Sequence, residues 1–513
     1  MLMPGSSVPE DSDIQKGMRT IMRIALVEPV KSLMPPLNLM ILAAVLEARG
    51  YEVTVMSVYD RQHSPGYSIP KIFSESLDRF RPDLIGIGFL SAEREPAQTI
   101  VEQLRCSFRE AIIVAGGRHP SSFPLEVLGW GADFVVVGEG ETALLELVES
   151  LNDGRPTVSI EGVARLDQNG VIRHVPRQSE SANLDITPSY HLVPYQKYID
   201  ARSAVIGRYF RAGWLMTSRG CFSKCIYCRD PRFGGRLRFR SIKAIVDDIR
   251  IQLDNYSLEC FYIIDDMFAI SESRVIEFCQ EFKKMQEEYN EKLYFAATAR
   301  TDKLTPQMVE AMKSAGCIQL SIGVESGSQR VLDFLQTGKR VDSVVPAFTM
   351  LKSAGIDTFV NFIVGVPGED DKDFQETLRL ARTIRHDTVG VSFLTPYPGT
   401  PLFQLSVARG WLSNAATIVF KHSDGLPKLD IGVSVDVLLE RRKTLLRTTW
   451  AKTFWTTVSR PEFIGFAAEL FVFLLFQPRL MLNLLKSLLV VDIDKFKELA
   501  REAAVERAGL SNP

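Results

Sequence analysis

The sequence predicts an α/β protein made of two successive groups of alternating strands and helices, followed by a helical C-terminal region. Apolar runs of strand length alternate with stretches of helical period in residues 21–152, and the same alternation returns in residues 206–412. A hydrophobic share of 46% in 513 residues indicates domains with sizeable cores. We therefore expect a doubly wound, Rossmann-like N-terminal sheet and a second, barrel-like unit.

Composition narrows the class of protein. A net charge of -2 argues against a protein that is held to nucleic acid by bulk positive charge. The seven cysteines are odd in number and unevenly spaced, which favours a reducing, cytoplasmic compartment over a disulfide framework. Residues 1–20 contain acidic side chains and no apolar core segment, so we expect a disordered tail there and not a secretory signal.

Residues 21–152 contain five strand-like runs, namely MRIALVE, YEVTVMSV, DLIGIGF, AIIVAGG and DFVVVGEGE. The helical stretches between them predict a parallel sheet, whose ligands bind at the carboxyl ends of the strands. Glycines there let a backbone approach a ligand, although each one alone fits an ordinary turn equally well. The notable residues at these ends are Glu28, Ser91, Gly116, Gly117, Gly138, Glu139 and Gly140.

Residues 153–205 have the features of a linker. The segment GVARLDQNGVIRHV alternates apolar and polar residues around Asn169 and Gly170, which predicts a small hairpin. No chemistry is visible in this segment.

Residues 206–412 contain six further candidate strands, namely WLMTS, CFYIID, LYFAATA, IQLSIG, TFVNFIV and VGVSFL. Six strand–helix units are too few for a closed eightfold barrel, so we expect a partial, TIM-like (β/α)6 barrel. Its active site should lie at the carboxyl ends of the strands, where the connecting loops face one cavity.

Three cysteines follow the first of these strands, in the segment TSRGCFSKCIYCRD. A structural zinc ion usually takes four protein ligands, but Cys221, Cys225 and Cys228 supply only three, and Cys260 falls inside a predicted strand. A 4Fe-4S cluster on three thiolates would leave one iron open to another ligand. Three buried or redox cysteines without a cluster are the less favoured alternative.

The CxxxCxxC spacing, with Tyr227 before the last cysteine, resembles the radical S-adenosylmethionine (SAM) superfamily, and the resemblance covers about residues 210–410. It implies that Cys221, Cys225 and Cys228 bind a 4Fe-4S cluster whose open iron is chelated by SAM. An electron would then cleave SAM to a 5'-deoxyadenosyl radical. A flavodoxin- or ferredoxin-type electron donor is implied as a partner.

The later strand ends agree with this resemblance. Asp265 and Asp266 resemble a DDxF segment that faces SAM, and Arg300 with Asp302 stands where the family places polar contacts to SAM. For each acidic residue singly, a solvated loop or a helix cap is an equal alternative. The remaining matches are Glu325 and Ser326 in a ribose-binding GxES segment, Gly365 beside adenine, and Glu369, which closes the turn.

The N-terminal sheet resembles the cobalamin-binding domain of cobalamin-dependent radical SAM enzymes, through MPPLNLMILAAVLEARGYEVTV, GGRHPSSFP and ADFVVVGEGE. The resemblance implies that Gly116 and Gly117 make room for the nucleotide tail of cobalamin, with Ser91 in the matching third loop. The loops around residues 28–37 and 138–141 would flank the corrin.

One departure concerns the lower face of cobalt. Many cobalamin domains carry DxHxxG after the first strand, whereas the segment here is EPVKSLMPP and contains no histidine. The lower face is then left to water, to no ligand or to another residue. For His119, a hydrogen-bonded loop histidine is favoured over a cobalt ligand.

This resemblance implies methylation of an unactivated carbon through methylcobalamin, and the alternative is a cobalamin-dependent oxidative cyclisation or ring rearrangement. A non-catalytic cobalamin or SAM sensor would be expected to lose a cysteine or the GxES segment, and neither is lost. A tRNA methylthio-transferring enzyme needs further N-terminal cysteines, but Cys106 alone precedes the triplet.

Residues 413–513 are predicted to be helical, with the apolar runs EFIGFAAELFVFLLF and RLMLNLLKSLLVV. Neither run reaches the roughly 20 apolar residues of a membrane-spanning helix. Two alternatives remain: helices packed on the barrel, or a peripheral contact of residues 440–495 with the inner face of a membrane. The second would make a lipid or isoprenoid substrate attractive beside other small molecules.

Overall fold

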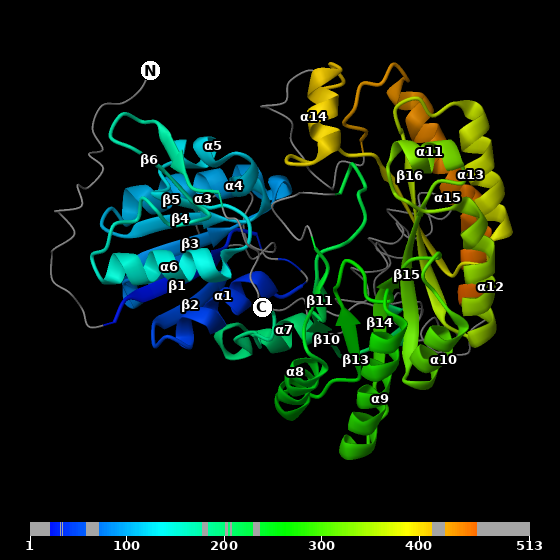
Figure 1. Cartoon of the computed structure of the whole chain (residues 1–513), viewed down its shortest axis with the longest axis horizontal. Helices are drawn as coiled ribbons and strands as arrows, with labels where there is room; N and C mark the ends of the chain where they lie inside the picture. Colours follow the sequence, from blue (N-terminus) through cyan, green and yellow to red (C-terminus); the bar gives the residue numbers. More distant parts are fainter. Residues whose placement is uncertain are drawn as a thin grey trace, which may run out of the picture.

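The computed structural model describes residues 21–30, 32, 34–57, 71–176, 183–200, 204–205, 208–228, 236–412 and 426–458. Two sheets stand beside each other, the N-terminal one in blue and cyan and the second in green and yellow (Figure 1). The tail predicted in residues 1–20 and the two apolar runs between residues 462 and 491 lie outside the described residues.

The N-terminal sheet has the strand order β2-β1-β3-β4-β5-β6-β7. Strands β1 to β5 pair in parallel, as predicted for a doubly wound sheet. The strands are β1 Arg23–Glu28, β2 Glu52–Ser57, β3 Leu84–Gly88, β4 Ile112–Gly116, β5 Phe134–Val136, β6 Val163–Leu166 and β7 Ile172–His174. The helices are α1 Leu37–Glu47, α2 Lys71–Phe80, α3 Arg94–Ser107, α4 Arg118–Ser122, α5 Pro124–Gly129 and α6 Gly140–Asn152, with a 3-10 turn at Ser91–Glu93.

The apolar runs form strands because both faces of the sheet are covered. Along β1, Ile24 and Leu26 face one core cluster, whereas Ala25 and Val27 face the other. Strands buried on both faces have continuous apolar sequences, as β1 has. The hairpin β6–β7, predicted in the linker, is present, and β6 pairs antiparallel with β5. The hairpin therefore extends the N-terminal sheet.

The second sheet contains the six predicted strands in the order β10-β13-β14-β15-β16-β17, all parallel. Within the described residues its two edge strands do not pair, so the barrel is open. The strands are β10 Ala212–Leu215, β13 Cys260–Ile263, β14 Tyr294–Ala299, β15 Cys317–Glu325, β16 Asp357–Val364 and β17 Thr388–Phe393. Two short pairs are β8 Ala204–Val205 with β9 Arg208–Tyr209, and β11 Ser218–Arg219 with β12 Arg238–Phe239.

Helices follow these strands, and most of them cover the outer side of the open barrel (Figure 1). They are α8 Ile242–Asn255, α9 Glu272–Tyr289, α10 Pro306–Ser314, α11 Gln329–Phe334, α12 Val344–Ala354, α13 Asp371–Thr383 and α14 Pro401–Ala408, with a 3-10 turn at Val341–Ser343.

The connector joins the two units through buried contacts. It forms a 3-10 turn at Tyr190–Leu192 and α7 at Tyr195–Asp200. The Tyr190 hydroxyl donates to Asp248 of α8 at 2.7 Å, and Asp248 also pairs with the buried Arg240 at 2.7 Å. One continuous apolar cluster runs from the N-terminal sheet through these tyrosines into the barrel, so packing fixes the relation of the two sheets.

The C-terminal helix α15, Val435–Val458, packs against β17, β16 and α13. Arg441 pairs with Asp371 at 2.8 Å, and Arg442 donates to the carbonyl of Val391 at 3.1 Å. Two arginines near the start of α15 therefore bind the barrel. Within the described part of the chain, no helix is long and apolar enough to cross a membrane. Contact of residues 440–495 with a membrane surface stays a prediction.

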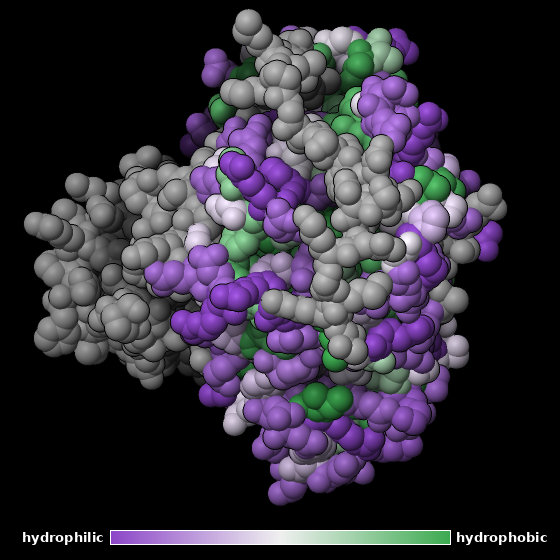
Figure 2. Space-filling model, turned by 90° about the vertical axis from the view of Figure 1, so that its left-hand side faces the viewer, coloured by the Kyte–Doolittle hydropathy of each residue, from purple (hydrophilic) through white to green (hydrophobic). Residues whose placement is uncertain are grey.

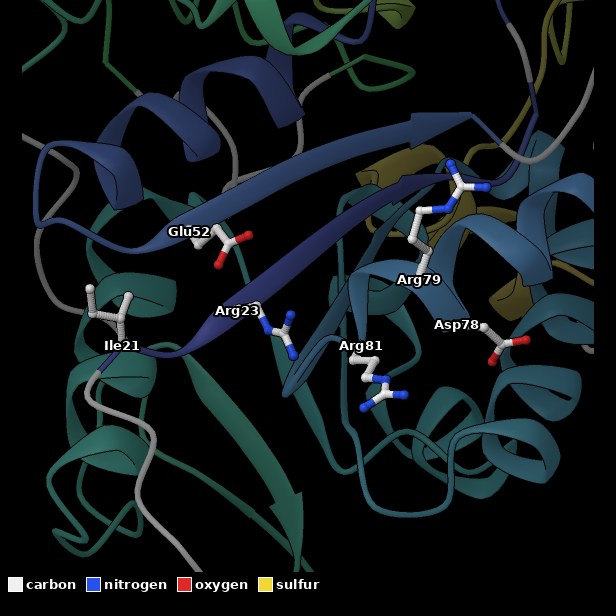
Figure 3. A pocket seen from close by; sticks show the side chains of 6 residues that line it. All are labelled: Ile21, Arg23, Glu52, Asp78, Arg79 and Arg81. Carbon is white, nitrogen blue, oxygen red and sulfur yellow. The ribbon is translucent and has the colours of Figure 1, made fainter.

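An open pocket lies at the edge where β1 and β2 begin, opposite the edge that carries the glycine loops. Figure 3 shows its lining side chains from β1, β2 and the end of α2, which are Ile21, Arg23, Glu52, Asp78, Arg79 and Arg81. None of these residues was predicted to be functional. On the face drawn in Figure 2, hydrophilic residues cover most of the surface coloured by hydropathy, and hydrophobic residues form small separate spots.

Candidate active site

The three-cysteine loop, residues 217–228, follows β10 at the carboxyl edge of the second sheet. Backbone hydrogen bonds fix its centre: Ile226 N–H donates to the carbonyl of Leu335 at 3.0 Å, and Leu402 N–H donates to the carbonyl of Ile226 at 2.9 Å. The loop is thereby anchored between the end of α11 and the start of α14. Cys228 N–H donates to the Cys225 carbonyl at 3.2 Å, which forms the turn that brings these two residues together.

The environment of the cysteines disfavours free thiolates. Burial raises the pKa of the Cys228 thiol to about 11, with a further contribution from the Asp266 carboxylate, while the Arg118 guanidinium opposes the shift. Burial also raises the pKa of Cys225, against the influence of Lys339. A metal centre removes this penalty, because its positive charge stabilises the coordinating thiolates. Coordination to a metal would therefore offset the cost of ionising these thiols.

The three cysteines have no fourth ligand side chain grouped with them in the described residues. The described residues contain no group of three or more His, Cys, Asp or Glu side chains arranged to hold one metal ion. A structural zinc ion usually takes four protein ligands, whereas three cysteines suffice for an iron-sulfur cluster that keeps one iron open.

Arg300, predicted to contact SAM, supports the cysteine loop. Its buried guanidinium donates to Ser223 Oγ at 2.7 Å and to the Thr337 carbonyl at 3.0 Å, and it pairs with Asp302 at 2.8 Å. It also lies 5.3 Å from the centre of the Phe222 ring. Arg300 thus ties the loop to the end of β14, and its contact with SAM stays a prediction.

The two adjacent aspartates after β13 have different environments. Asp265 is buried and accepts hydrogen bonds from Thr217 N–H at 2.6 Å and Ser218 Oγ at 2.6 Å. Burial raises its pKa, and these hydrogen bonds oppose the rise. Asp266 is exposed and acts electrostatically on Cys228. Asp265 therefore fixes the start of the cysteine loop, and Asp266 is the carboxylate with access to solvent.

Glu325 stands in a strained position at the end of β15. Its φ of 68° lies in the left-handed region, which is uncommon for residues other than glycine and recurs at functional sites. Its Oε1 accepts from Lys339 Nζ at 2.9 Å, and the Tyr227 hydroxyl is hydrogen-bonded to its carboxylate. A Cβ on Gly323 would lie 2.2 Å from the same Oε1. Glycine at 323 thus makes room for a carboxylate beside Cys225.

Ser326 and Gly365 are enclosed by the protein. Ser326 is fully buried, and its hydroxyl lies 3.0 Å from Thr377 Oγ1. Gly365 has a φ of 78°, and a Cβ there would lie 3.5 Å from Leu438 of α15. Gly365 N–H donates to Glu369 at 3.2 Å, so Glu369 does close this turn. Ligand contacts of Ser326 and Gly365 stay predictions.

At the carboxyl edge of the N-terminal sheet, two adjacent glycines differ in their surroundings. A Cβ on Gly117 would lie 2.6 Å from the Phe89 carbonyl oxygen, and its φ is 99°. A Cβ on Gly116 would meet only ordinary contacts at 3.9 Å. Gly117 is therefore required by the fold, whereas a side chain at 116 would meet no close contact, and the role of Gly116 beside cobalamin stays a prediction.

The histidine of this edge is hydrogen-bonded and packed, as favoured from the sequence. His119 is buried, its Nδ1 lies 3.2 Å from Ser91 Oγ, and its ring stacks on Trp130 with 6.0 Å between centroids. Its Nε2 lies 3.5 Å from Glu126. Both ring nitrogens therefore face protein atoms.

The remaining residues predicted beside the corrin have protein neighbours. Glu28 is buried beside Tyr198. The pKa of Tyr198 is raised mainly by its own burial and further by the Glu28 carboxylate. Gly138 N–H donates to Ser121 Oγ at 3.0 Å, and a Cβ on Gly140 would lie 3.1 Å from Leu42. The Glu139 carboxylate binds two arginines of the barrel unit, Arg219 and Arg238.

The carboxyl edges of the two sheets therefore converge. Arg118, directly after the glycine pair of the first sheet, is close enough to Cys228 to influence its pKa. Phe123 contacts Phe403 of α14 edge-on, with 6.1 Å between ring centroids. The cysteine loop thus lies next to the glycine loops of the other unit.

Comparison with known proteins agrees with this geometry. Residues 23–148 match the B12 binding domain, and residues 215–381 match the radical SAM superfamily. The chain belongs to the cobalamin-dependent radical SAM family.

Two relatives and one solved structure illustrate what this chain is similar to. The chain is 29% identical over 386 residues to an uncharacterised methyltransferase of Pyrococcus horikoshii, which covers 74% of this chain and 80% of the relative. It is 27% identical to an anaerobic magnesium-protoporphyrin IX monomethyl ester cyclase of Rubrivivax gelatinosus, over 72% of this chain and 66% of the cyclase. The structure of the radical SAM methyltransferase TsrM from Kitasatospora setae aligns with a TM-score of 0.62 at 20% identity, over 76% of this chain and 78% of that one.

Several residues of this radical SAM protein that surround the cysteines were missed from the sequence. Lys339 and Arg118 have no motif that marks them, and their roles depend on contacts with distant segments. Arg219 carried a signal, because it directly precedes the Gly220-Cys221 pair. Its partners, however, come from the other domain.

Proposed function

We propose that this protein is a cobalamin-dependent radical SAM C-methyltransferase that acts on a small molecule. The observation that supports it best is the convergence of the two carboxyl edges, where Glu139 and Glu141 of the B12-binding domain pair with Arg238 and Arg219 beside the cysteine loop. A methyl carrier must lie close to the carbon that the radical activates, and this arrangement provides that proximity.

The residues present have separable tasks in this proposal. When bound, the cluster with SAM supplies a radical that abstracts hydrogen, and cobalamin supplies the methyl group. Cys221, Cys225 and Cys228 hold the cluster, and Arg300 keeps their loop in place through Ser223. Lys339 and Glu325 offer a charged pair beside Cys225, suited to the amino and carboxylate groups of SAM.

Cyclisation without net methylation is the second candidate. The relationship to the Rubrivivax gelatinosus cyclase favours it, and the relationship to the Pyrococcus horikoshii methyltransferase favours methylation. Both reactions use the same two domains, so the fold does not separate them.

An experiment without the natural substrate separates them. The full chain is reconstituted anaerobically with iron, sulfide and cobalamin, and SAM with a labelled methyl group is added with a reductant. We expect 5'-deoxyadenosine, S-adenosylhomocysteine and labelled methylcobalamin by mass spectrometry. Formation of 5'-deoxyadenosine without labelled methylcobalamin would favour the cyclase, and the absence of all three products would reject the proposal.

Two cysteine variants serve as a matched pair for this experiment. Cys225→Ala removes a predicted cluster ligand and should abolish iron binding and 5'-deoxyadenosine formation. Cys106→Ala changes an exposed cysteine of α3 and should leave both at the wild-type level. Equal iron contents in the two variants would contradict the assignment of the cysteine loop.

A further inference from the structure

Two carboxylates of the B12-binding domain bind two guanidinium groups beside the cysteine loop, and we call this group the interdomain clasp (Glu139, Glu141, Arg219 and Arg238). Glu139 takes both Nη atoms of Arg238, with Nη1 at 3.0 Å from Oε2. Arg219 Nη1 lies 2.7 Å from Glu141 Oε1 and 3.5 Å from Glu139 Oε1. Two negative and two positive charges therefore balance.

The clasp is largely withdrawn from water. The side chains of Glu139 and Glu141 are 7% and 9% exposed, and those of Arg219 and Arg238 are 22% and 17% exposed. Bidentate pairs of arginine with carboxylate are strong and geometrically specific. Loss of one partner from a buried pair leaves an uncompensated charge, which is costly. Both carboxylates also lie at the N-terminus of α6, where the helix dipole favours negative charge.

The two arginines of the clasp lie on the same pair of short strands. Strands β11 and β12 pair antiparallel, with Arg219 directly opposite Arg238. Like charges directly opposite each other destabilise a strand pair. Strands of two residues have little stability of their own. Because Glu139 interacts with both arginines, the B12-binding domain supplies the charge that this hairpin needs.

The hairpin leads directly into the cysteine loop. Arg219 ends β11, and Cys221 follows two residues later. Asp265 fixes Ser218 on the other side of Arg219 through its hydroxyl. A displacement of Arg219 is therefore transmitted along the backbone to Cys221.

We propose that Glu139 is a positioning residue that holds the β11–β12 hairpin, and with it Cys221, against the B12-binding domain. Docking of one domain thereby sets the geometry of the loop in the other. The consequence for an iron-sulfur cluster rests on the proposed function, whereas the consequence for the loop does not.

The first test uses the full chain without cofactors. The alkylation rates of Cys221, Cys225 and Cys228 by iodoacetamide are measured by peptide mass spectrometry in the wild type and in Glu139→Gln. We expect alkylation of Cys221 to accelerate severalfold in Glu139→Gln, because its loop is released. The matched control is Glu149→Gln. Glu149 also lies on α6, but its carboxylate pairs with Arg49 at the surface, so this substitution should leave the rate unchanged.

The second test uses the reconstituted protein. A misplacement of about 1 Å can reduce a rate by about a hundredfold, so Glu139→Gln should lower the rate of 5'-deoxyadenosine formation per iron by about ten- to a hundredfold. The electron paramagnetic resonance spectrum of the reduced protein with SAM should also differ from that of the wild type. The double variant Glu139→Gln/Arg238→Gln, which removes the repulsion between the arginines, should recover part of the loss.

The outcomes are distinct. If Glu139→Gln lowers only the melting temperature, with wild-type alkylation of Cys221 and a wild-type rate per iron, the clasp is simple adhesion between domains and the positioning role is overturned. If the wild type cleaves no SAM but Cys221 is released in Glu139→Gln, the proposed function fails and the positioning role stands.

Discussion

The two carboxyl edges that meet at the candidate site are built in different ways. At the barrel edge, side chains such as Asp265 and Arg300 form a dense set of hydrogen bonds that fixes the cysteine loop. At the edge of the B12-binding domain, the two adjacent glycines differ, because Gly117 is crowded by the Phe89 backbone while Gly116 is not. The barrel edge is fixed mainly by hydrogen bonds between side chains, whereas close packing of the backbone limits which residue can stand at position 117 of the other edge.

The largest effect is expected from Arg300→Lys at the barrel edge. Lysine keeps the positive charge but lacks the planar guanidinium group, whose several N–H donors bind Ser223, Thr337 and Asp302 at once. Breaking this buried network should lower the free energy of unfolding by about 3 kcal/mol, measured by urea denaturation. Bound iron after reconstitution should fall with it. An unchanged iron content would show that the cysteine loop does not depend on Arg300.

A smaller loss is expected from Gly117→Ala. The new Cβ would lie 2.6 Å from a backbone oxygen at a positive φ, so the substitution should destabilise the fold by about 2 kcal/mol. The free energy of urea unfolding is the measurement. Wild-type stability would mean that the crowding by Phe89 is relieved at little cost.

At the barrel edge, Glu369 should make the stability of the protein depend on pH. Burial raises the pKa of Glu369 to about 7, although Arg441 opposes the rise. Between pH 4.5 and 7 the folded state then binds more protons than the unfolded state, so this group's contribution to stability declines as pH rises through that window. The decline should be on the order of 2 kcal/mol. Urea unfolding at pH 5 and pH 7.5 should show it in the wild type and not in Glu369→Gln, and equal slopes would contradict it.

The smallest effect on stability is expected from Gly116→Ala, the neighbour and control of Gly117→Ala. Its Cβ would have ordinary contacts at 3.9 Å, so the free energy of unfolding should change by less than about 0.5 kcal/mol. If this position faces cobalamin, the affinity for cobalamin, measured by titration, should nevertheless fall. Wild-type affinity would remove Gly116 from the proposed site.

Much of the architecture was predictable because its signals are local. The six barrel strands follow from apolar runs between helical stretches, and the cysteine triplet is evident from its spacing alone. The stop of α1 near Gly50 is equally local, because Gly50 takes the positive φ of 83° that glycine tolerates. Features of this kind depend on a few consecutive residues, so they can be read from the sequence.

Contacts between distant segments were decided only by the tertiary structure. The resemblance placed the loop of Glu139 beside a corrin, which stays a prediction, but nothing in the sequence indicated that its carboxylate binds arginines about 80 and 100 residues away. The same holds for α15, whose arginines bind the barrel, and for the hairpin β6–β7, which joins the first sheet. A charged residue has the same local pattern whether its partner is water, a ligand or another domain, and only packing chooses among them.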